Sequence, residues 1–237
     1  MIDIHTHILP ELDDGSRNVD ESIVMLGMLS DQGVDTVVAT PHFYIDKTNP
    51  RDFLQSRNES FQKLKKQIEG MEQRPGIALG AEVQFYNELS SLDGIEQFCL
   101  GESNYILVEM PFAPWNGYVY QTLNNLSASR RITPVIAHFE RYLDFMNEKE
   151  TVLKLKEAGA LIQINCSFLT DRSGKRKALN LVKKGEISFL GSDCHNTTSR
   201  PPDMNEGAEV IRKKLGDNGF ERIEYRENKL MQKMLIY

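Results

Sequence analysis

Seven short apolar runs, most of them separated by helix-like segments, constrain the fold of this 237-residue chain more than any other feature. The runs cover roughly residues 2–7, 34–40, 77–83, 105–110, 132–138, 160–166 and 187–193. Helical periodicity predicts helices over roughly residues 18–33, 51–73, 118–129, 148–158 and 175–184. Alternating strands and helices imply a parallel sheet. Seven such units predict an α/β barrel related to the (β/α)8 architecture but one unit short, and an open doubly wound sheet is the structural alternative.

Charge and cysteine content restrict the partners and the compartment. The net charge is −6 and the pI is about 5.5, which argues against broad binding to nucleic acid or to an anionic membrane, because both need a basic face. The cysteines Cys99, Cys166 and Cys194 are too few for a disulfide framework, and there is no secretory signal. No apolar run approaches the ~18 residues needed to cross a bilayer. We therefore expect a cytoplasmic protein with no nucleic-acid partner and no direct membrane insertion.

Potential metal ligands mark the carboxyl ends of the predicted strands. Each of the five histidines stands at or just after the end of an apolar run, and four acids lie at such ends or in the loop after the first strand: His5, His7, His42, His138, His195, Asp14, Glu82, Glu109 and Asp193. His5 and His7 are two residues apart on a strand, so they point to the same face. In a barrel the strand ends converge on one face, where these side chains should meet. The alternative is a set of ordinary core or surface histidines that share no metal.

Nine potential ligands exceed the needs of one ion. Imidazoles and carboxylates in this number would serve two or three divalent ions, with a carboxylate as a bridge. Closely spaced divalent ions support hydrolysis, of which phosphoester cleavage is a common form. No glycine-rich phosphate-binding motif precedes a predicted helix, so the sequence suggests no nucleotide cofactor.

Five parts of the sequence together resemble the polymerase-and-histidinol-phosphatase (PHP) superfamily. They are His5-Thr6-His7 with Asp13-Asp14-Gly15, Ala39-Thr40-Pro41-His42, Gly80-Ala81-Glu82, His138-Phe139-Glu140-Arg141-Tyr142 and Ser192-Asp193-Cys194-His195-Asn196. Within the superfamily, residues 1 to about 202 are most similar to the capsule- and exopolysaccharide-biosynthesis tyrosine phosphatases of Gram-positive bacteria. The resemblance implies one PHP-type metallophosphatase domain over residues 1–237, folded as a distorted (β/α)7 TIM-like barrel. It also implies a trinuclear manganese site that dephosphorylates phosphotyrosine on a bacterial tyrosine kinase of polysaccharide synthesis.

The same resemblance assigns individual roles. It places His5, His7, Glu82 and Asp193 on one ion, Asp14, His42 and His195 on a second, and Glu82, Glu109 and His138 on a third, with Glu82 as the bridge. Manganese is the expected metal, and zinc, iron, cobalt and magnesium are the alternatives. Arg141 and Arg200 match phosphate-binding arginines, because a guanidinium can hold a phosphate with two parallel hydrogen bonds. A metal-bridging hydroxide would then attack phosphorus in line, while the ions and Arg141 stabilise the equatorial oxygens.

Aromatic residues near the strand ends are candidates for substrate contacts. Phe43, Tyr44, Phe112 and Trp115 lie in predicted loops that should border the site. They would either flank a phosphotyrosine ring or only cover the mouth of the barrel. Cys194 stands between two hard-ligand positions, and as a soft ligand it is expected to pack inward instead of binding metal.

One segment matches a different kind of tyrosine phosphatase. Cys166 is followed after five residues by Arg172 and Ser173, which is the spacing of the cysteine-dependent enzymes. That chemistry needs a thiolate in a loop whose amides face the phosphate. Phe168 and the anion Asp171 do not suit such a loop, so we expect Cys166→Ser to leave activity intact.

Other functions would use a similar set of residues. A histidinol phosphate phosphatase or a DNA exonuclease of the same superfamily would share nearly all the ligands, but the acidic pI argues against a nuclease. An amidohydrolase would need a bridging lysine at a strand end, and none stands there. A non-catalytic metal-holding regulatory module would lack ligands or phosphate arginines. Residues 221–237 carry no pattern that we can interpret.

Overall fold

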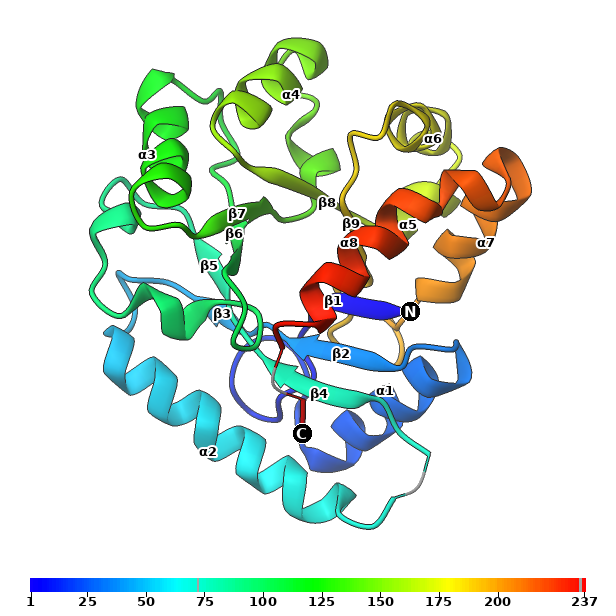
Figure 1. The fold of residues 1–237 in the computed structure, drawn as a ribbon. Helices are drawn as coiled ribbons and strands as arrows, with labels where there is room; N and C mark the ends of the chain where they lie inside the picture. The colour runs from blue at the N-terminus through cyan, green and yellow to red at the C-terminus, as the bar shows by residue number, and fades with distance from the viewer. Residues whose placement is uncertain (72, 235) are drawn as a thin grey trace.

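Parallel strands form a curved sheet at the centre of the molecule (Figure 1). The computed structural model describes residues 1–71, 73–234 and 236–237. Its strands are β1 (Ile2–Thr6), β2 (Thr36–Ala39), β3 (His42–Phe43), β4 (Gly76–Leu79), β5 (Glu82–Gln84), β6 (Tyr105–Glu109), β7 (Thr133–Ile136), β8 (Leu161–Asn165) and β9 (Phe189–Gly191). All the paired strands run parallel, as the alternation of strands and helices predicted.

The nine strand segments of the described chain occupy seven positions in a barrel. β2 and β3 are parts of one path interrupted at residues 40–41, and β4 and β5 are parts of another interrupted at residues 80–81. The order around the sheet is therefore β1, β2/β3, β4/β5, β6, β7, β8 and β9. A bridge between Thr6 and Cys194 joins β9 back to β1. The predicted (β/α)7 barrel is confirmed, and the interruptions are part of its distortion.

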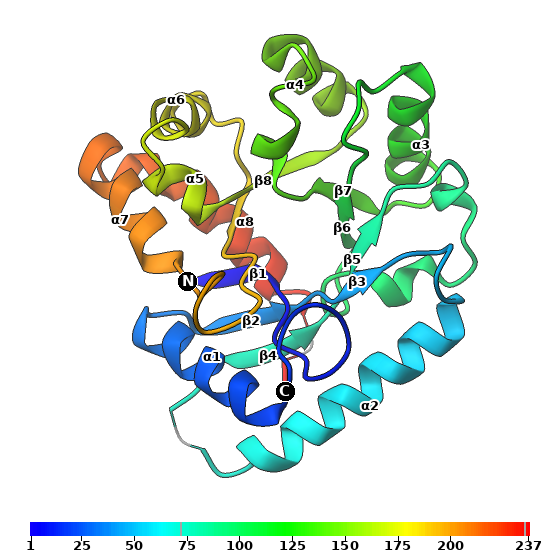
Figure 2. The same cartoon turned by 180° about the vertical axis from the view of Figure 1, so that it is seen from behind.

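Helices surround this sheet (Figure 2). They are α1 (Val19–Asp31), α2 (Pro50–Ile68), α3 (Gly117–Ala128), α4 (Glu148–Glu157), α5 (Cys166–Thr170), α6 (Lys175–Lys184), α7 (Met204–Leu215) and α8 (Glu221–Met231), with the 3-10 turns η1 (Leu89–Ser91), η2 (Ile95–Phe98), η3 (Phe139–Tyr142) and η4 (Asp217–Gly219). Asn18 caps α1, since its side chain accepts a hydrogen bond from the Glu21 amide at 2.9 Å. Within the described residues, no helix combines the length and the apolarity that crossing a membrane requires.

Several predicted boundaries were wrong. The helix predicted over residues 51–73 ends at Ile68, and Met71 is exposed beyond it; residue 72 lies outside the described part of the chain. Cys166, predicted to end a strand, instead opens α5. The segments α7 and α8 were not predicted, and α8 falls in the region 221–237, in which residue 235 is also undescribed.

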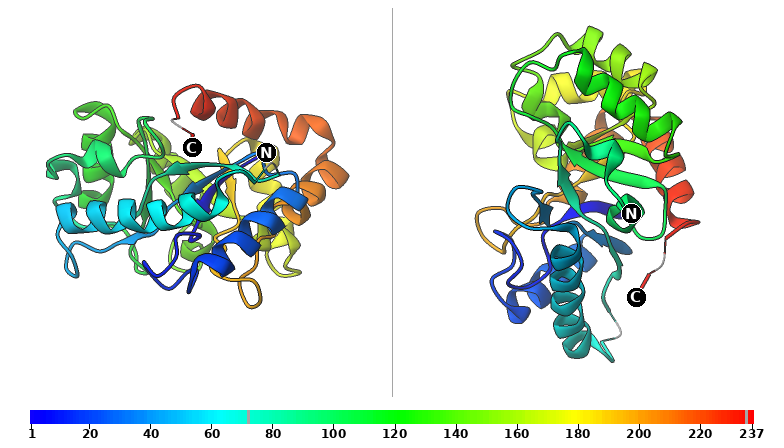
Figure 3. Two further views of the ribbon diagram at one scale, coloured as in Figure 1. Left: turned by 90° about the horizontal axis from the view of Figure 1, so that it is seen from below. Right: turned by 90° about the vertical axis from the view of Figure 1, so that its left-hand side faces the viewer.

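Apolar side chains fill the end of the barrel at which the strands begin. One cluster contains Ile2, Tyr105 and Phe189, which open their strands, together with Leu230 of α8. Helix α8 lies in front of the strands in Figure 1 and across one side of the sheet in the left-hand view of Figure 3. A second, larger cluster packs the strands against the surrounding helices. The carboxyl ends of the strands are thereby left for polar side chains.

A β-bulge in β1 aims two histidines into the barrel. The pairing of β1 with β2 shifts between Asp3 and Thr6, so that three steps on β1 match two on β2. This shift reverses the alternation of side chains along the strand. Ile2 and Ile4 belong to the inner apolar cluster, and His5, which follows Ile4 within the shifted stretch, supplies an atom to a group of potential metal donors together with His7.

Candidate metal centre

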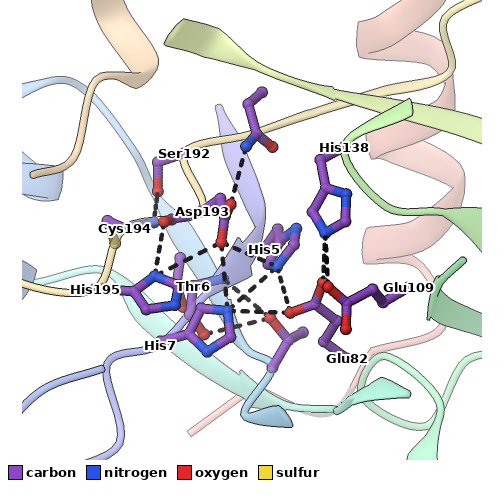
Figure 4. Close-up of polar contacts among 12 residues, drawn as sticks. His5, Thr6, His7, Glu82, Glu109, His138, Ser192, Asp193, Cys194 and His195 are labelled. Carbon is purple, nitrogen blue, oxygen red and sulfur yellow. Dashed lines mark hydrogen bonds and ion pairs between the residues drawn. The ribbon is translucent and has the colours of Figure 1, made fainter. Parts of the chain in front are cut away.

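The nine predicted ligands lie together at the carboxyl ends of the strands. Figure 4 shows them except for Asp14 and His42. Three groups of donor atoms form there, and within each group all the atoms lie within 4.8 Å of one another. The groups are His5, His7, Glu82 and Asp193; His7, Asp14, His42 and His195; and His42, Glu82 and Glu109. Glu82 belongs to two groups, which is the position that a bridging carboxylate would have.

The most buried group is the one predicted for the first ion. His5 Nε2 lies 3.1 Å from Glu82 Oε2 and 3.4 Å from Asp193 Oδ1. His7 Nε2 lies 3.3 Å and 3.5 Å from the same two oxygens. All four side chains are buried. Two imidazoles and two carboxylates therefore face one another in a volume that bulk water barely reaches.

The other two groups differ in part from the prediction. His7 joins Asp14, His42 and His195 in the second group, in which Asp14 is 65 % exposed. His42 takes the place predicted for His138 in the third group. His138 is still nearby, with its Nε2 at 2.8 Å from Glu82 and 3.7 Å from Glu109.

Hydrogen bonds on the outer side of the rings fix how the histidines are turned. His7 Nδ1 lies 2.7 Å from Asp13 Oδ2, and His195 Nδ1 lies 2.9 Å from the Asp193 carbonyl oxygen. Because a carboxylate and a carbonyl can only accept, each Nδ1 carries the hydrogen and donates it. The Nε2 lone pairs of both rings are then directed to the centre of the cluster, as a metal ligand requires.

Unpaired buried atoms test whether this donor set suits metal ions. Within the described chain, Glu82 Oε2, His42 Nδ1 and His195 Nε2 are buried and make no hydrogen bond of good geometry, although His42 Nδ1 lies 3.0 Å from Glu82 Oε2. Buried polar atoms in folded proteins are nearly always paired, so these three need another partner. Imidazole nitrogen and carboxylate oxygen are the ligands that divalent manganese, iron and zinc accept. The residues fit a cluster of such ions.

Burial and charge set the ionisation of the cluster. Burial opposes ionisation of Glu82, but the neighbouring imidazoles, His5 first among them, hold the pKa of its carboxyl well below the usual range. Burial also opposes protonation of His7, yet the Asp13 carboxylate raises the pKa of His7 well above its ordinary value. Burial, with the charge of His7, lowers the pKa of His195 to about 4. The Glu82 carboxylate thus remains ionised in the buried part of the site, where it attracts positive charge.

Unusual backbone conformations place two of these residues. His138 has φ 32° and Asp193 has φ 54°, although side chains other than glycine seldom adopt the left-handed region. Such strain is found where the surrounding structure fixes a functional geometry. Gly191 supports the same geometry in another way, because a Cβ there would lie 2.7 Å from the Cβ of His5.

The two predicted phosphate arginines meet at one ligand. Arg200 Nη2 lies 2.8 Å from Asp193 Oδ2, and Arg141 Nη2 forms an ion pair with the same oxygen. Their side chains are 39 % and 36 % exposed, so both guanidiniums can also be reached from solvent. A cavity of about 450 Å³ borders both arginines and Asp193.

The predicted aromatic contacts separate into two kinds. Tyr44 stacks on His42 with ring centroids 5.2 Å apart, and it borders a cavity of about 520 Å³ that His42 and Asp14 also line. Phe112 is 53 % exposed and lies nearly parallel to the His138 ring at 6.4 Å. Trp115 and Phe43, in contrast, are buried among other aromatic side chains. Their burial leaves them little surface for a substrate, and this corrects the expectation that all four border the site.

The surroundings of Cys166 do not suit a nucleophilic cysteine. It is fully buried at the start of α5, where its Sγ lies 3.8 Å from the Met204 carbonyl oxygen. Burial raises the pKa of its thiol well above the ordinary value. Cys194 is also buried, and it is in none of the three donor groups found among the described residues. The geometry therefore favours metal chemistry over thiolate chemistry.

Side chains that hold the ligands in place were not predicted in that role. Asp13 and Tyr142 contact the outer nitrogens of His7 and His138 at 2.7 and 3.1 Å. Gln163 and Asn165, both buried on β8, connect further ligands. Their signal was present, because two amides at alternate positions of an otherwise apolar strand point to the same face.

The fold and the site together define a class of protein. A seven-position parallel barrel with nine clustered metal donors and two arginines at the carboxyl ends of its strands has the architecture of a PHP-type metallohydrolase. The family model described as capsular polysaccharide synthesis, CpsB/CapC, matches residues 1–233. The chain belongs to this CpsB/CapC family.

Relatives of the chain are named tyrosine phosphatases. It is 33 % identical over 222 residues to the tyrosine-protein phosphatase YwqE of Bacillus subtilis, covering 91 % of this chain and 85 % of that protein. It is 31 % identical over 225 residues to the tyrosine-protein phosphatase CpsB of Streptococcus pneumoniae, covering 91 % of each.

Solved structures extend this likeness to the fold. Among the crystal structures of YwqE and CpsB, described as unique metal-dependent tyrosine phosphatases, one matches with a TM-score of 0.86 and 30 % identity over 100 % of this chain and 96 % of its own. A TatD-family hydrolase from Entamoeba histolytica matches over 97 % of each chain, with a TM-score of 0.54 and 8 % identity, and shows a shared fold alone.

Proposed function

We propose that this protein is a metal-dependent protein-tyrosine phosphatase, folded as one PHP-type domain over residues 1–237. The observation that carries the proposal is the convergence of nine metal donors and two arginines on one end of the barrel. The names of its relatives support phosphotyrosine as the substrate. The family description supports a bacterial tyrosine kinase of capsule or exopolysaccharide synthesis as the partner, which would place the protein in the cytoplasm.

His5, His7, Asp14, His42, Glu82, Glu109, His138, Asp193 and His195 would hold two or three ions, and we propose manganese as the metal. Divalent ions bound there would supply positive charge for the phosphate oxygens and lower the pKa of water. Arg141 and Arg200 would bind the phosphate with paired hydrogen bonds. Both arginines would release their ion pairs with Asp193 and bind the substrate phosphate instead, since their guanidiniums already reach the edge of the cluster.

The tyrosyl ring would lie between the cluster and the exposed aromatic side chains. Phe112 and Tyr44 each cover a ligand histidine and still present a face to solvent or to a cavity. Tyrosinate is a fair leaving group, with a pKa of about 10, so the reaction does not require a strong acid from the protein.

The direct test is hydrolysis of p-nitrophenyl phosphate by protein that has been stripped of metal and reloaded with manganese. We expect activity with manganese, none with chelator, and a large loss in Glu82→Gln but not in the exposed control Glu88→Gln. If the protein is inactive with manganese, cobalt and zinc alike, the proposed phosphatase activity is refuted. Parallel assays with a phosphotyrosine peptide and histidinol phosphate identify the substrate class, and a preference for histidinol phosphate would favour the alternative function.

A further inference from the structure

Two buried amides lie behind the candidate ligands and connect them. Gln163 and Asn165 stand two residues apart on β8, and their exposed fractions are 0 % and 4 %. Neither is a predicted ligand. Their hydrogen bonds nevertheless reach the segments that carry His5, His138 and Asp193.

The direction of this hydrogen-bonded chain is fixed from one end. The His138 backbone amide donates to Gln163 Oε1 at 2.7 Å. Because a backbone amide can only donate, the oxygen of Gln163 is on this side and its NH2 group on the other. Gln163 Nε2 donates to Asn165 Oδ1 at 2.9 Å. Asn165 Nδ2 is then the group that donates to Asp193 Oδ2, at 3.0 Å.

The same oxygen of Gln163 sets the tautomer of His5. Gln163 Oε1 lies 3.3 Å from His5 Nδ1 and can only accept, so His5 Nδ1 carries the hydrogen. The Nε2 lone pair of His5 is then directed to Glu82 and Asp193. One buried amide therefore influences two residues of the most buried donor group, His5 directly and Asp193 through Asn165.

The carboxylate of Asp193 is shared between two sets of partners. Its Oδ1 faces the imidazoles of His5 and His7, and its Oδ2 faces Asn165, Arg141 and Arg200. The arginines are partly exposed, whereas Asn165 is buried and already oriented by Gln163. If both guanidiniums turn to a phosphate, Asn165 is the donor that stays on Oδ2.

We propose that Gln163 and Asn165 are positioning residues. They hold Asp193 in its ligand orientation and thereby let Arg141 and Arg200 exchange between Asp193 and a substrate phosphate. The exchange rests on the proposed phosphatase function, but the orientation of the donor group does not. Metal binding and catalysis therefore test the two parts separately.

The first measurement is the affinity of metal-free protein for manganese, obtained by competition with a fluorescent chelator. Asn165→Asp keeps the acceptor for Gln163 but puts a second carboxylate beside Asp193. Gln163→Glu keeps the acceptor for His5 and the His138 amide but cannot donate to Asn165. We expect each variant to bind manganese about 10–100-fold more weakly, as is typical when a residue that orients a metal ligand by a hydrogen bond is replaced. Asn124→Asp, the same change on the exposed face of α3, should bind like the wild type.

The second measurement separates KM from kcat with p-nitrophenyl phosphate at saturating manganese. In Asn165→Asp the added carboxylate retains both guanidiniums, so KM should rise several-fold and inorganic phosphate should inhibit less. The change in kcat should be smaller than the change in KM.

Two results would overturn the proposal. One is wild-type manganese affinity in both Asn165→Asp and Gln163→Glu. The other is a loss of kcat with unchanged KM, accompanied by a lower Tm in chelator, which would indicate only a structural role. If Asn165→Asp does not fold, Gln163→Glu still decides the question. Wild-type protein that binds manganese but hydrolyses no phosphate ester would refute the proposed function and the arginine exchange, while the affinity comparison still tests the orientation of Asp193.

Discussion

Asp13 allows a quantitative test of how outer hydrogen bonds support the cluster. Its Oδ2 accepts from His7 Nδ1 at 2.7 Å and from the His42 amide at 3.0 Å, and its Oδ1 accepts from the Gly15 amide at 2.9 Å. Although burial opposes ionisation, the charge of His7 holds the pKa of this carboxyl well below its usual range. Asp13→Asn replaces one of the two acceptor oxygens with an NH2 group. In either orientation of the amide, at least one of these donors loses its acceptor.

The expected size of the effect follows from those contacts. Leaving one buried donor unpaired costs about 1–3 kcal/mol of stability. Replacing the carboxylate behind a ligating imidazole typically weakens metal binding about 10–100-fold. We therefore expect Asp13→Asn to lower both the free energy of unfolding in chelator and the affinity for manganese. Asp93→Asn, at an exposed position away from the cluster, should change neither.

Urea unfolding in chelator measures the first effect, and manganese titration of metal-free protein measures the second. Unchanged manganese affinity in Asp13→Asn would show that His7 does not depend on Asp13 for its ligand tautomer. Lower stability together with normal affinity would leave the hydrogen-bond argument in place and refute the metal argument. Urea unfolding thus reports how the hydrogen bonds of Asp13 stabilise the fold, and the manganese titration reports how Asp13 orients the ligand His7.

Three further predictions concern separate parts of the chain. Cys166→Ser should retain manganese-dependent hydrolysis of p-nitrophenyl phosphate, and complete loss of activity would contradict metal chemistry. Arg141→Lys should lower kcat/KM at least several-fold, mainly through KM, because a lysine cannot make the paired hydrogen bonds of a guanidinium; unchanged KM would exclude Arg141 from phosphate binding. Burial raises the pKa of Glu227 from 4.5 to about 7, so its stabilising contribution is complete below pH 4.5 and is lost as the pH rises through 7. Glu227→Gln should therefore raise the free energy of unfolding by roughly 1–3 kcal/mol above about pH 8 and change it little near pH 4.5, and an equal gain at both pH values would contradict this assignment.

The sequence was sufficient for the seven strand positions of the barrel and for the ends at which the ligands lie, although β3 was predicted as a loop. Short apolar runs that stop at a proline, as at Pro41 and Pro111, are local signals of buried strands. The topology then followed, because parallel strands bring their carboxyl ends to one side of a barrel. This is why residues as far apart as His5 and Asp193 could be placed together before any contact was known.

The details that the sequence could not supply depend on contacts between distant segments. The bulge in β1 is a shift in its register with β2, and the left-handed residue His138 is held by a hydrogen bond from its amide to Gln163 of β8. His42 stands in the third donor group, where the sequence predicted His138. The burial of Trp115 could not be predicted either, because it packs on Tyr142 from a different segment.

The site divides into a rigid part and an adaptable part, and the division follows the secondary structure. The most buried donors lie on strands or directly after them and are nearly closed to solvent, whereas Phe112, Arg141 and Arg200 lie in turns or loops and are partly exposed. Strand ends fix positions well, while loops vary at little cost to the fold. Substitutions at the strand ends should therefore change metal affinity and the reaction itself. Substitutions in the loops should change which phosphate ester binds, because those side chains face the substrate and not the centre of the cluster.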